Sequence, residues 1–269
     1  MTNMDYGPTA SMADGQKVHL PRLRIISWNL LRLFGAKVND VADLIERHHP
    51  DLLVMQEATE DFAELPSLVG GHFFREPLSE RVYGLAAWSP HPLPQPKALP
   101  LPVSAIPGKV PPRLAQLIKF GGATFANVHL SHGQFLNRWQ LLHIARSLEG
   151  PAAIIGDYNA VGPIGLAGYK DVGPREPTHS PTNVISFRLD RCMTRGLTCL
   201  GKSALQRGSS DHHPILLDLK ISSEALQPSH RDGPFGSFQQ RTDRLLRSVV
   251  RSRARARRNA DNFERCNGA

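Results

Sequence analysis

AAIIGDYN, residues 152–159, is the stretch that decides the fold. Four apolar residues in a row are typical of a buried strand, and the run then ends on Asp157 and Asn159, polar residues that a structural role does not require. The stretch DLLVMQE, residues 51–57, has the same form and ends on Glu57. Active sites of α/β folds assemble where strands end. Both stretches therefore predict an α/β sheet with a functional edge.

Strand-like and helix-like segments alternate along the chain from residue 23 onward. Apolar, β-branched runs indicate strands, and apolar side chains spaced three to four residues apart indicate helices. We expect strands at residues 23–29, 51–57, 82–89, 113–120, 123–130, 152–159, 184–193 and 213–220, and helices at 38–49 and 137–148. Asn39 is the expected N-cap of the first helix. Hairpins beside βαβ-like units favour an α/β sandwich with mixed sheets over a purely parallel sheet.

Glycine and proline mark the connections between these segments. The pair Gly121-Gly122 predicts a hairpin between the strands at 113–120 and 123–130. Nine of the 23 residues from 90 to 112 are proline, which excludes a central strand or helix and predicts an edge segment or a long loop. A Gly/Pro-rich loop is expected from the end of the strand at 152–159 to residue 182.

Composition restricts the class of protein. The chain has 269 residues, of which 41% are hydrophobic, so it can bury a core and is not disordered throughout. Its three cysteines show no CxxC spacing, which predicts neither a disulfide framework nor a zinc knuckle. The first twenty residues do not resemble a secretory signal, and no apolar run reaches the roughly 18 residues that span a bilayer. We expect a cytoplasmic protein, either free or peripheral at the inner face of a membrane.

The formal charge of +8 is concentrated in one segment. Residues 241–258 contain eight arginines and one acid, for a net charge of +7, whereas the remaining residues carry 24 basic and 23 acidic groups. Apolar residues at 245, 246, 249 and 250 give this segment two turns of an amphipathic stripe. It is either a basic helix that lies on an anionic membrane or on nucleic acid, or a solvated tail.

Polar residues recur where the expected strands end or begin. A lone His or Asn at a strand end is usually a hydrogen-bonded loop residue, but a set of six such sites indicates a function. Carboxylate and amide oxygens suit Mg²⁺ or Mn²⁺, and imidazoles suit phosphate contact and proton transfer. The six sites are Asn29, Glu57, His129, the pair Asp157 and Asn159, Asp190, and the cluster Ser210-Asp211-His212.

In chain order, the motifs SWN, PDLLVMQE, NVHL, GDYN, RLD and SDHHP resemble those of the endonuclease/exonuclease/phosphatase superfamily. These metal-dependent phosphoesterases include DNase I, apurinic endonucleases, inositol-polyphosphate 5-phosphatases and neutral sphingomyelinases. The resemblance covers about residues 22–220. It implies a DNase I-like four-layer α/β/β/α sandwich with two mixed sheets. It also implies a Mg²⁺-dependent hydrolase, with Mn²⁺ as the alternative metal, that acts on a phosphodiester or phosphomonoester by in-line attack of water.

The resemblance also implies roles for the oxygen donors. Glu57 is similar to the principal metal ligand of the family, with Asn29 beside it, and Asp211 is expected to reach the metal or a second metal. Asp157 resembles the residue that orients or deprotonates the attacking water. Asn159 is expected to donate to a phosphoryl oxygen as charge develops on it.

For the remaining site residues, the resemblance implies two histidines with separate roles and one carboxylate that holds the first of them. His212 is similar to the histidine next to the scissile phosphate, and Asp190 to the carboxylate that holds that imidazole. His129 is expected to contact phosphate or to assist departure of the leaving oxygen. Whether Asp157 or the Asp190–His212 pair is the general base stays open. Leu31 stands where some nucleases carry an aspartate that assists the metal.

Four segments follow from these observations. We expect a flexible leader at residues 1–21, the catalytic domain at 22–221, a linker at 222–240 and the arginine-rich tail at 241–269. Enzymes that bind DNA usually have a basic groove for the phosphate backbone, but the residues outside 241–258 have a net charge of only +1. The substrate therefore stays open between nucleic acid, phospholipid and a small phosphoester. The alternative function is a non-catalytic protein that binds membrane or nucleic acid through residues 241–258.

Overall fold

The computed structural model describes residues 22–104, 110–182 and 185–223 of the chain. The leader expected at residues 1–21 and the tail expected at 241–269 lie outside the described residues, as does the linker from residue 224 onward. Within the described ranges, no helix is long and apolar enough to cross a membrane.

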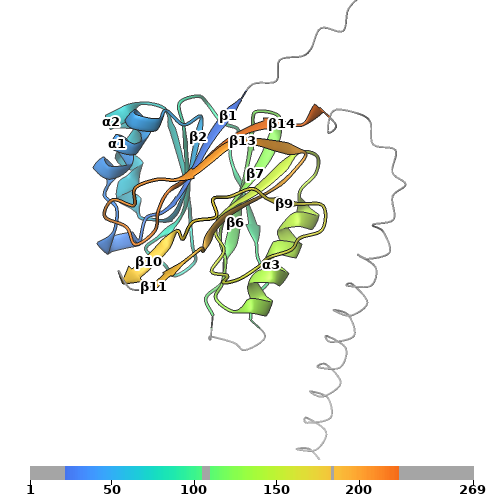
Figure 1. Ribbon diagram of the computed structural model, residues 1–269. Coiled ribbons are helices and arrows are strands. Elements are labelled where there is room, and N and C mark those ends of the chain that lie inside the picture. Colours follow the sequence, from blue (N-terminus) through green and yellow to red (C-terminus); the bar gives the residue numbers. More distant parts are fainter. Residues whose placement is uncertain (1–21, 105–109, 183–184, 224–269) are drawn as a thin grey trace, which may run out of the picture. The chain divides into compact units, whose positions relative to one another are not determined.

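Two six-stranded mixed sheets form the centre of the fold (Figure 1). The first sheet has the order β13 (Leu197–Ala204), β14 (Ile215–Ile221), β1 (Leu23–Asn29), β2 (Leu52–Ala58), β4 (Gly84–Ser89), β3 (His72–Pro77). The second has the order β5 (Lys97–Pro100), β6 (Leu114–Phe120), β7 (Ala123–His129), β8 (Ala152–Asp157), β12 (Asp190–Arg195), β9 (Lys170–Asp171). In each sheet one pair is parallel, β1 with β2 and β7 with β8, and the other pairs are antiparallel. The prediction of mixed sheets is confirmed.

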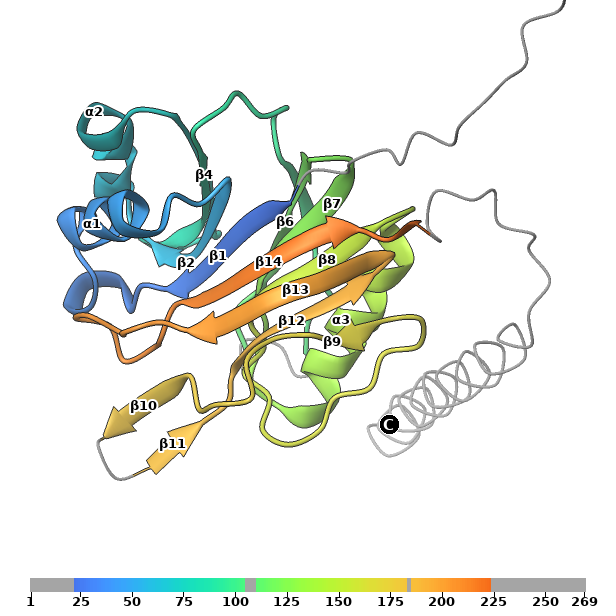
Figure 2. The ribbon, with the colours of Figure 1, turned by 45° about the horizontal axis from the view of Figure 1, so that its top comes forward.

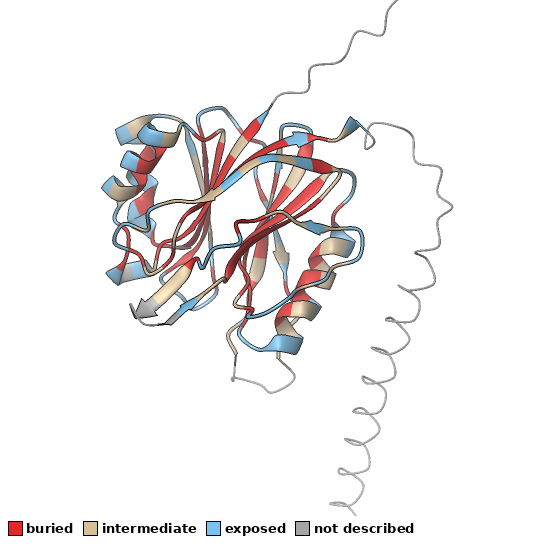
Figure 3. Cartoon of the chain, in the orientation of Figure 1, coloured by how far each residue is buried: buried red, intermediate tan, exposed pale blue. Residues whose placement is uncertain are grey.

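Helices cover the outer faces of both sheets, which makes the four layers (Figure 1). α1 (Val38–His48) and α2 (Leu65–Val69), with the short 3₁₀ helices η1 (Arg32–Phe34) and η2 (Glu60–Glu64), lie on the side of the first sheet. α3 (Gln134–Ser147) covers the second sheet. Successive side chains of a strand point to opposite faces of its sheet. Here both faces are covered, one by the other sheet and one by helices, so the central strands are buried on both sides, as Figure 3 shows.

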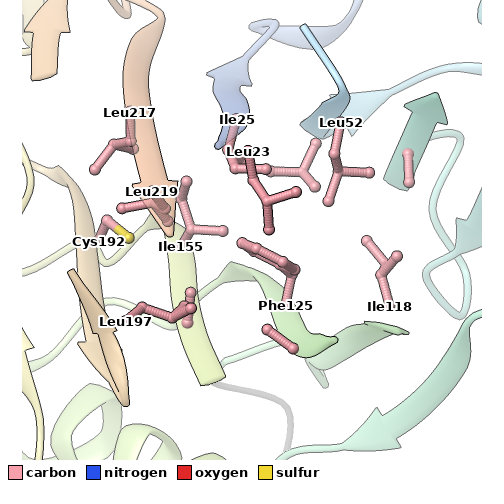
Figure 4. Close-up of a cluster of buried hydrophobic side chains, with 14 of the residues drawn as sticks. Leu23, Ile25, Leu52, Ile118, Phe125, Ile155, Cys192, Leu197, Leu217 and Leu219 are labelled. Carbon is pink, nitrogen blue, oxygen red and sulfur yellow. The ribbon is translucent and has the colours of Figure 1, made fainter. Parts of the chain in front are cut away.

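Three apolar clusters fill the spaces between these layers. The cluster between the sheets contains Ile25, Leu52, Phe125, Ile155 and Leu217 (Figure 4). A second cluster lies under α1 and α2, and a third lies under α3. The continuous apolar runs in the sequence follow from this arrangement, since a strand between two apolar layers needs no polar face.

The helix boundaries differ from the expectation in two places. Asn39 is not the N-cap of α1: the cap is Lys37, whose backbone N–H donates to the Asp40 carboxylate at 2.8 Å. The carboxylate that accepts the backbone N–H at the helix start belongs to Asp40, a residue of the first turn, and not to the N-cap residue. α3 begins at Gln134, three residues earlier than expected, because Gly133 with φ 104° ends the preceding loop.

The strand expected at 184–193 is two strands. β11 (Ile185–Phe187) pairs with β10 (His179–Thr182) in a hairpin that projects beyond both sheets (Figure 2), and β12 continues in the second sheet. Between them the Arg188 guanidinium binds the Asp171 carboxylate through two hydrogen bonds of 2.7 Å. β3, β9, β10 and β13 were not expected from the sequence. An edge segment or a long loop was expected for the proline-rich stretch, and β5 lies there at the edge of the second sheet.

A buried polar network joins the two sheets beneath the polar strand ends. Gln56 Nε2 of β2 donates to Asn127 Oδ1 of β7 at 2.7 Å and to Ser27 Oγ at 3.1 Å. Gly156 of β8 lies against this network with φ 141°, and a Cβ there would be 2.0 Å from the Val128 carbonyl oxygen. Only glycine fits this position, so the glycine of GDYN brings β8 close to β7 and β2.

Candidate active site

Strand pairing brings the polar strand ends to one edge of the sandwich. β1 and β2 are parallel in the first sheet and place Asn29 and Glu57 at their carboxyl ends. In the second sheet the register sets His129, Asp157 and Asp190 opposite one another on three neighbouring strands. The segment before β14 contributes Asp211 and His212.

The Asp157 carboxylate is the point where these side chains meet. Its Oδ2 accepts a hydrogen bond from Asn29 Nδ2 at 3.0 Å, and it lies 3.5 Å from His129 Nε2 and 3.8 Å from His212 Nε2. Its Oδ1 accepts from the backbone N–H of Asn159 at 2.8 Å. The side chain of Asp157 is 2% exposed. A buried carboxylate in this arrangement is held in one orientation by groups from both sheets.

His212 is held by a buried carboxylate and by its own backbone. Its Nδ1 lies 2.8 Å from Asp190 Oδ2, and its carbonyl oxygen accepts from Trp28 Nε1 at 3.0 Å. Burial alone would lower the pKa of His212, but the Asp190 carboxylate, with Asp157 and Asp211 adding to it, raises that pKa to about 9. The imidazole therefore carries a positive charge at neutral pH, with an N–H on each ring nitrogen.

His129 is buried in the opposite charge state. Burial, together with the Arg113 guanidinium beside it, lowers the pKa of His129 to about 3, so the ring is neutral at physiological pH. Arg113 Nη1 lies 3.3 Å from His129 Nδ1. Because a guanidinium can only donate, Nδ1 is the acceptor and the ring proton is on Nε2, which faces Asp157.

Glu57, the penultimate residue of β2, has a left-handed backbone conformation, with φ 57°. Non-glycine residues rarely adopt this conformation outside functional or constrained positions. The nearest basic groups, Arg32 Nε and the neutral His129 Nδ1, are each 3.9 Å from a carboxylate oxygen, beyond hydrogen-bonding distance. Burial raises the pKa of Glu57, while Arg32 opposes the shift. The Glu57 carboxylate fits a divalent cation, because neither neighbour is close enough to occupy its lone pairs.

The amides of Asn29 and Asn159 are both oriented by local contacts. Asn29 Oδ1 accepts from the Leu31 backbone N–H at 3.1 Å, and its remaining lone pair can serve a cation. Asn159 has φ 46°, and its Nδ2 donates to the Leu130 carbonyl at 2.9 Å. One hydrogen of the Asn159 amide is therefore engaged within the protein, and the second is left for a ligand.

Asp211 lies beside a histidine that sequence reasoning missed. Its Oδ2 is 3.2 Å from His179 Nε2 in the β10–β11 hairpin, and its Oδ1 is 3.9 Å from His212 Nε2. Burial favours the neutral acid, but the hydrogen bond with His179 and the neighbouring charges lower the pKa of Asp211. Arg113 was also missed. Neither residue belongs to a motif of the kind considered, and only the fold brings them to the site.

All eight predicted site residues therefore lie at one edge. Asp157 connects Asn29, His129, Asn159 and His212 directly, and Asp190 joins through His212. Glu57 borders the set next to His129, and Asp211 borders it next to His212. Their individual roles stay predictions.

The model of the Endonuclease/Exonuclease/phosphatase family matches residues 26–212, a span that contains all eight. The chain belongs to this family. Its members hydrolyse phosphoester bonds and generally depend on divalent metal ions.

Solved structures share the fold. A humanized D. rerio TDP2 carrying 14 mutations is 19% identical, with a TM-score of 0.61 over 74% of this chain and 99% of that one. D. rerio TDP2 complexed with a single-strand DNA product is 20% identical, with a TM-score of 0.59 over 74% and 99%. A Beutenbergia cavernae endonuclease/exonuclease/phosphatase is 18% identical, with a TM-score of 0.58 over 75% and 72%. No curated protein matches the sequence. At these identities the similarity establishes the fold alone.

Proposed function

We propose that the protein is a Mg²⁺-dependent phosphoesterase that hydrolyses a phosphodiester or phosphomonoester by in-line attack of water. The observation that carries the proposal is the convergence of Asn29, His129, His212 and Asn159 on the Asp157 carboxylate. A structural role does not require two histidines and two carboxylates in one buried edge, and burying them carries a cost. In-line displacement at phosphorus requires a base, donors for phosphoryl oxygens and positive charge.

Glu57 and Asn29 are the residues that would hold the cation. Their oxygens come from neighbouring strand ends of one sheet, and Mg²⁺ needs only one or two protein oxygens because it keeps waters and phosphate as further ligands. Mn²⁺ accepts the same donors. When bound, the ion supplies positive charge to the phosphoryl oxygens as negative charge develops on them.

Asp157 is the better candidate for the general base. The alternative base is His212, but its pKa of about 9 means that Nε2 carries a proton at neutral pH and cannot accept another. Asp157 accepts hydrogen bonds on both oxygens from neutral donors and keeps further lone pairs for a water molecule. Asp190 then acts through His212, whose ring it orients and keeps charged.

Three donors can serve the phosphoryl group. The charged His212 ring presents an N–H on Nε2, and the neutral His129 ring presents one on its own Nε2. The second amide hydrogen of Asn159 is the third. Fixed donors lower the barrier when they face the position at which charge develops, because they need no reorganisation during the reaction. His212 is also the group best suited to protonate a leaving oxygen.

The test is hydrolysis of bis(4-nitrophenyl) phosphate, DNA and phospholipid vesicles with Mg²⁺, with Mn²⁺ and with EDTA. We expect metal-dependent turnover that Asn159→Ala and His212→Ala each reduce by roughly 100-fold or more. His72→Ala, an exposed residue at the start of β3, is the matched control and should keep wild-type activity. Turnover on none of the substrates above the Asn159→Ala, His212→Ala double variant would refute the proposal.

The same assay distinguishes the substrate classes. A TDP2 structure contains a single-strand DNA product, so single-stranded and duplex DNA are both included. Truncation before residue 241 tests the predicted tail, because binding to anionic vesicles or DNA that disappears with the tail assigns it a localising function. Binding that requires the tail, in a protein without turnover, would favour the non-catalytic alternative.

A further inference from the structure

We propose that His179, Asp211 and His212 form a second metal site, selective for zinc-like transition metals and separate from the Glu57 and Asn29 oxygens. His179 comes from the β10–β11 hairpin, and the other two come from the segment before β14. Each offers one ligand atom, and the three atoms lie within 4.8 Å of one another. Bound to one tetrahedral ion at about 2.0–2.2 Å, such atoms lie about 3.3–3.6 Å apart, so small side-chain rotations would bring the three atoms to a shared ion.

The backbone holds the three residues in place. His179 and His212 form an antiparallel β-bridge, and their rings lie 4.4 Å apart, tilted by 49°. The bridge is extended on both sides by hydrogen bonds from the backbone N–H of His213 to the Thr178 carbonyl at 2.7 Å and of Ser180 to the Asp211 carbonyl at 2.9 Å. The site is therefore built by main-chain pairing, so little ordering is needed on binding.

Two further observations point to a ligand. His212 Nδ1 lies 2.8 Å from the fully buried Asp190 carboxylate, which is the carboxylate–histidine pairing that usually supports a histidine bound to metal through its other nitrogen. Asp211 Oδ1 is buried and accepts no hydrogen bond from the described residues. A carboxylate oxygen in this state is costly to bury, and a cation would satisfy it.

The donor set determines which metal fits. Two imidazoles and one carboxylate suit Zn²⁺ or Co²⁺, whereas Mg²⁺ prefers oxygen ligands throughout. Three protein ligands leave coordination positions open. The His179 and Asp211 side chains are 16% and 22% exposed, so the metal has an entry path from solvent.

The site has a consequence for activity that rests on the proposed function. A metal bound at His212 Nε2 would occupy the ring atom that lies 3.8 Å from Asp157 Oδ2. Zn²⁺ should then inhibit Mg²⁺-dependent hydrolysis, because the ring could no longer donate to the phosphoryl group from that atom, and added Mg²⁺ should not relieve the inhibition.

Binding is tested first, without reference to activity. The tag-free, full-length protein in saturating Mg²⁺ is titrated with Co²⁺, and the visible absorption of the bound ion is recorded. We expect the protein to bind one equivalent of Co²⁺, which Zn²⁺ displaces. The affinity for Co²⁺ should fall at least tenfold in His179→Gln and in Asp211→Asn. His72→Gln is the matched control, because the chain has twelve histidines and weak binding elsewhere must be subtracted.

His179→Phe keeps an aromatic ring against His212 but offers no ligand, so it replaces His179→Gln if circular dichroism shows that the latter is unfolded. Absence of a Co²⁺ spectrum in the wild type, or a spectrum that survives in a folded His179 variant, overturns the site. If hydrolysis is observed, the Zn²⁺ concentration for half-inhibition should rise at least tenfold in that variant. A Co²⁺ site in a protein without turnover would leave the metal site standing and refute only the proposed hydrolase.

Discussion

Replacing Asp190 with asparagine should reveal how strongly the buried carboxylate stabilises the charge on His212. The substitution keeps the shape of the side chain and removes its charge. His212 has a pKa of about 9 in the folded protein, against 6.5 for a free histidine. At about 1.4 kcal/mol per pKa unit, the shift corresponds to roughly 3 kcal/mol of stability. Burial by itself lowers this pKa, and Asp190 offsets burial as well as raising the pKa, whereas Asp157 and Asp211 supply part of the rise. We therefore expect about 2–3 kcal/mol from Asp190.

The sign of the effect depends on pH in a defined way. A pKa raised by folding stabilises the protein fully below 6.5, and that contribution is lost as pH rises through 9. Asp190→Asn should therefore lower the free energy of unfolding most at pH 6 and least near pH 10. The difference between wild type and variant should shrink by about 2–3 kcal/mol across this range.

Urea unfolding in EDTA at pH 6, 8 and 10, followed by circular dichroism, measures these differences. Asp171→Asn is not a suitable control because it breaks two arginine contacts, so Asp43→Asn on the exposed face of α1 is used instead. Equal destabilisation by Asp190→Asn at pH 6 and pH 10 would refute the reasoning, because the carboxylate would then not be stabilising a charge on His212.

Three further predictions follow from individual residues. Glu57→Gln should raise the Mg²⁺ concentration needed for half-maximal hydrolysis at least tenfold, measured by metal titration of activity; an unchanged requirement would exclude Glu57 as a ligand. The pKa of about 3 for His129 means that unfolding is favoured as pH falls below 6.5. Wild type should therefore lose about 1.4 kcal/mol more per pH unit between pH 6 and 4 than His129→Gln, and parallel stability profiles in EDTA would contradict this. Gly156→Ala should destabilise the protein by about 2–4 kcal/mol, since its Cβ would meet the Val128 carbonyl; a melting temperature within a degree of wild type would show that β8 can shift.

The architecture was largely predictable because apolar periodicity is a local property. Runs such as residues 23–29 and 152–159 are buried on both faces and were recognisable as strands. β13 was missed because it lies at the sheet edge, where exposed and half-buried positions alternate over a weakly apolar stretch. The break at Arg188 was missed because it depends on Asp171, a partner on another strand.

The eight candidate residues were identifiable because each stands at a strand end in a motif shared with a known family. Arg113 and His179 were not, because nothing within a few residues of them distinguishes a site residue from a loop residue. Arg113, which directly precedes β6, reaches His129 at the end of β7, and His179 reaches Asp211 across a β-bridge. Both contacts join residues that are distant in sequence, and only pairing of the strands brings them together.

By itself, the sequence determined which residue types stand at the strand ends, and so the kind of chemistry the edge can support. Tertiary structure alone decided their charge states. His129 and His212 are the same residue type, and both are buried, yet the pKa of one is lowered to about 3 and that of the other is raised to about 9. Burial lowers both pKa values, and the neighbouring groups make the difference. A guanidinium beside the His129 ring adds to the lowering, whereas the Asp190 carboxylate beside the His212 ring outweighs it.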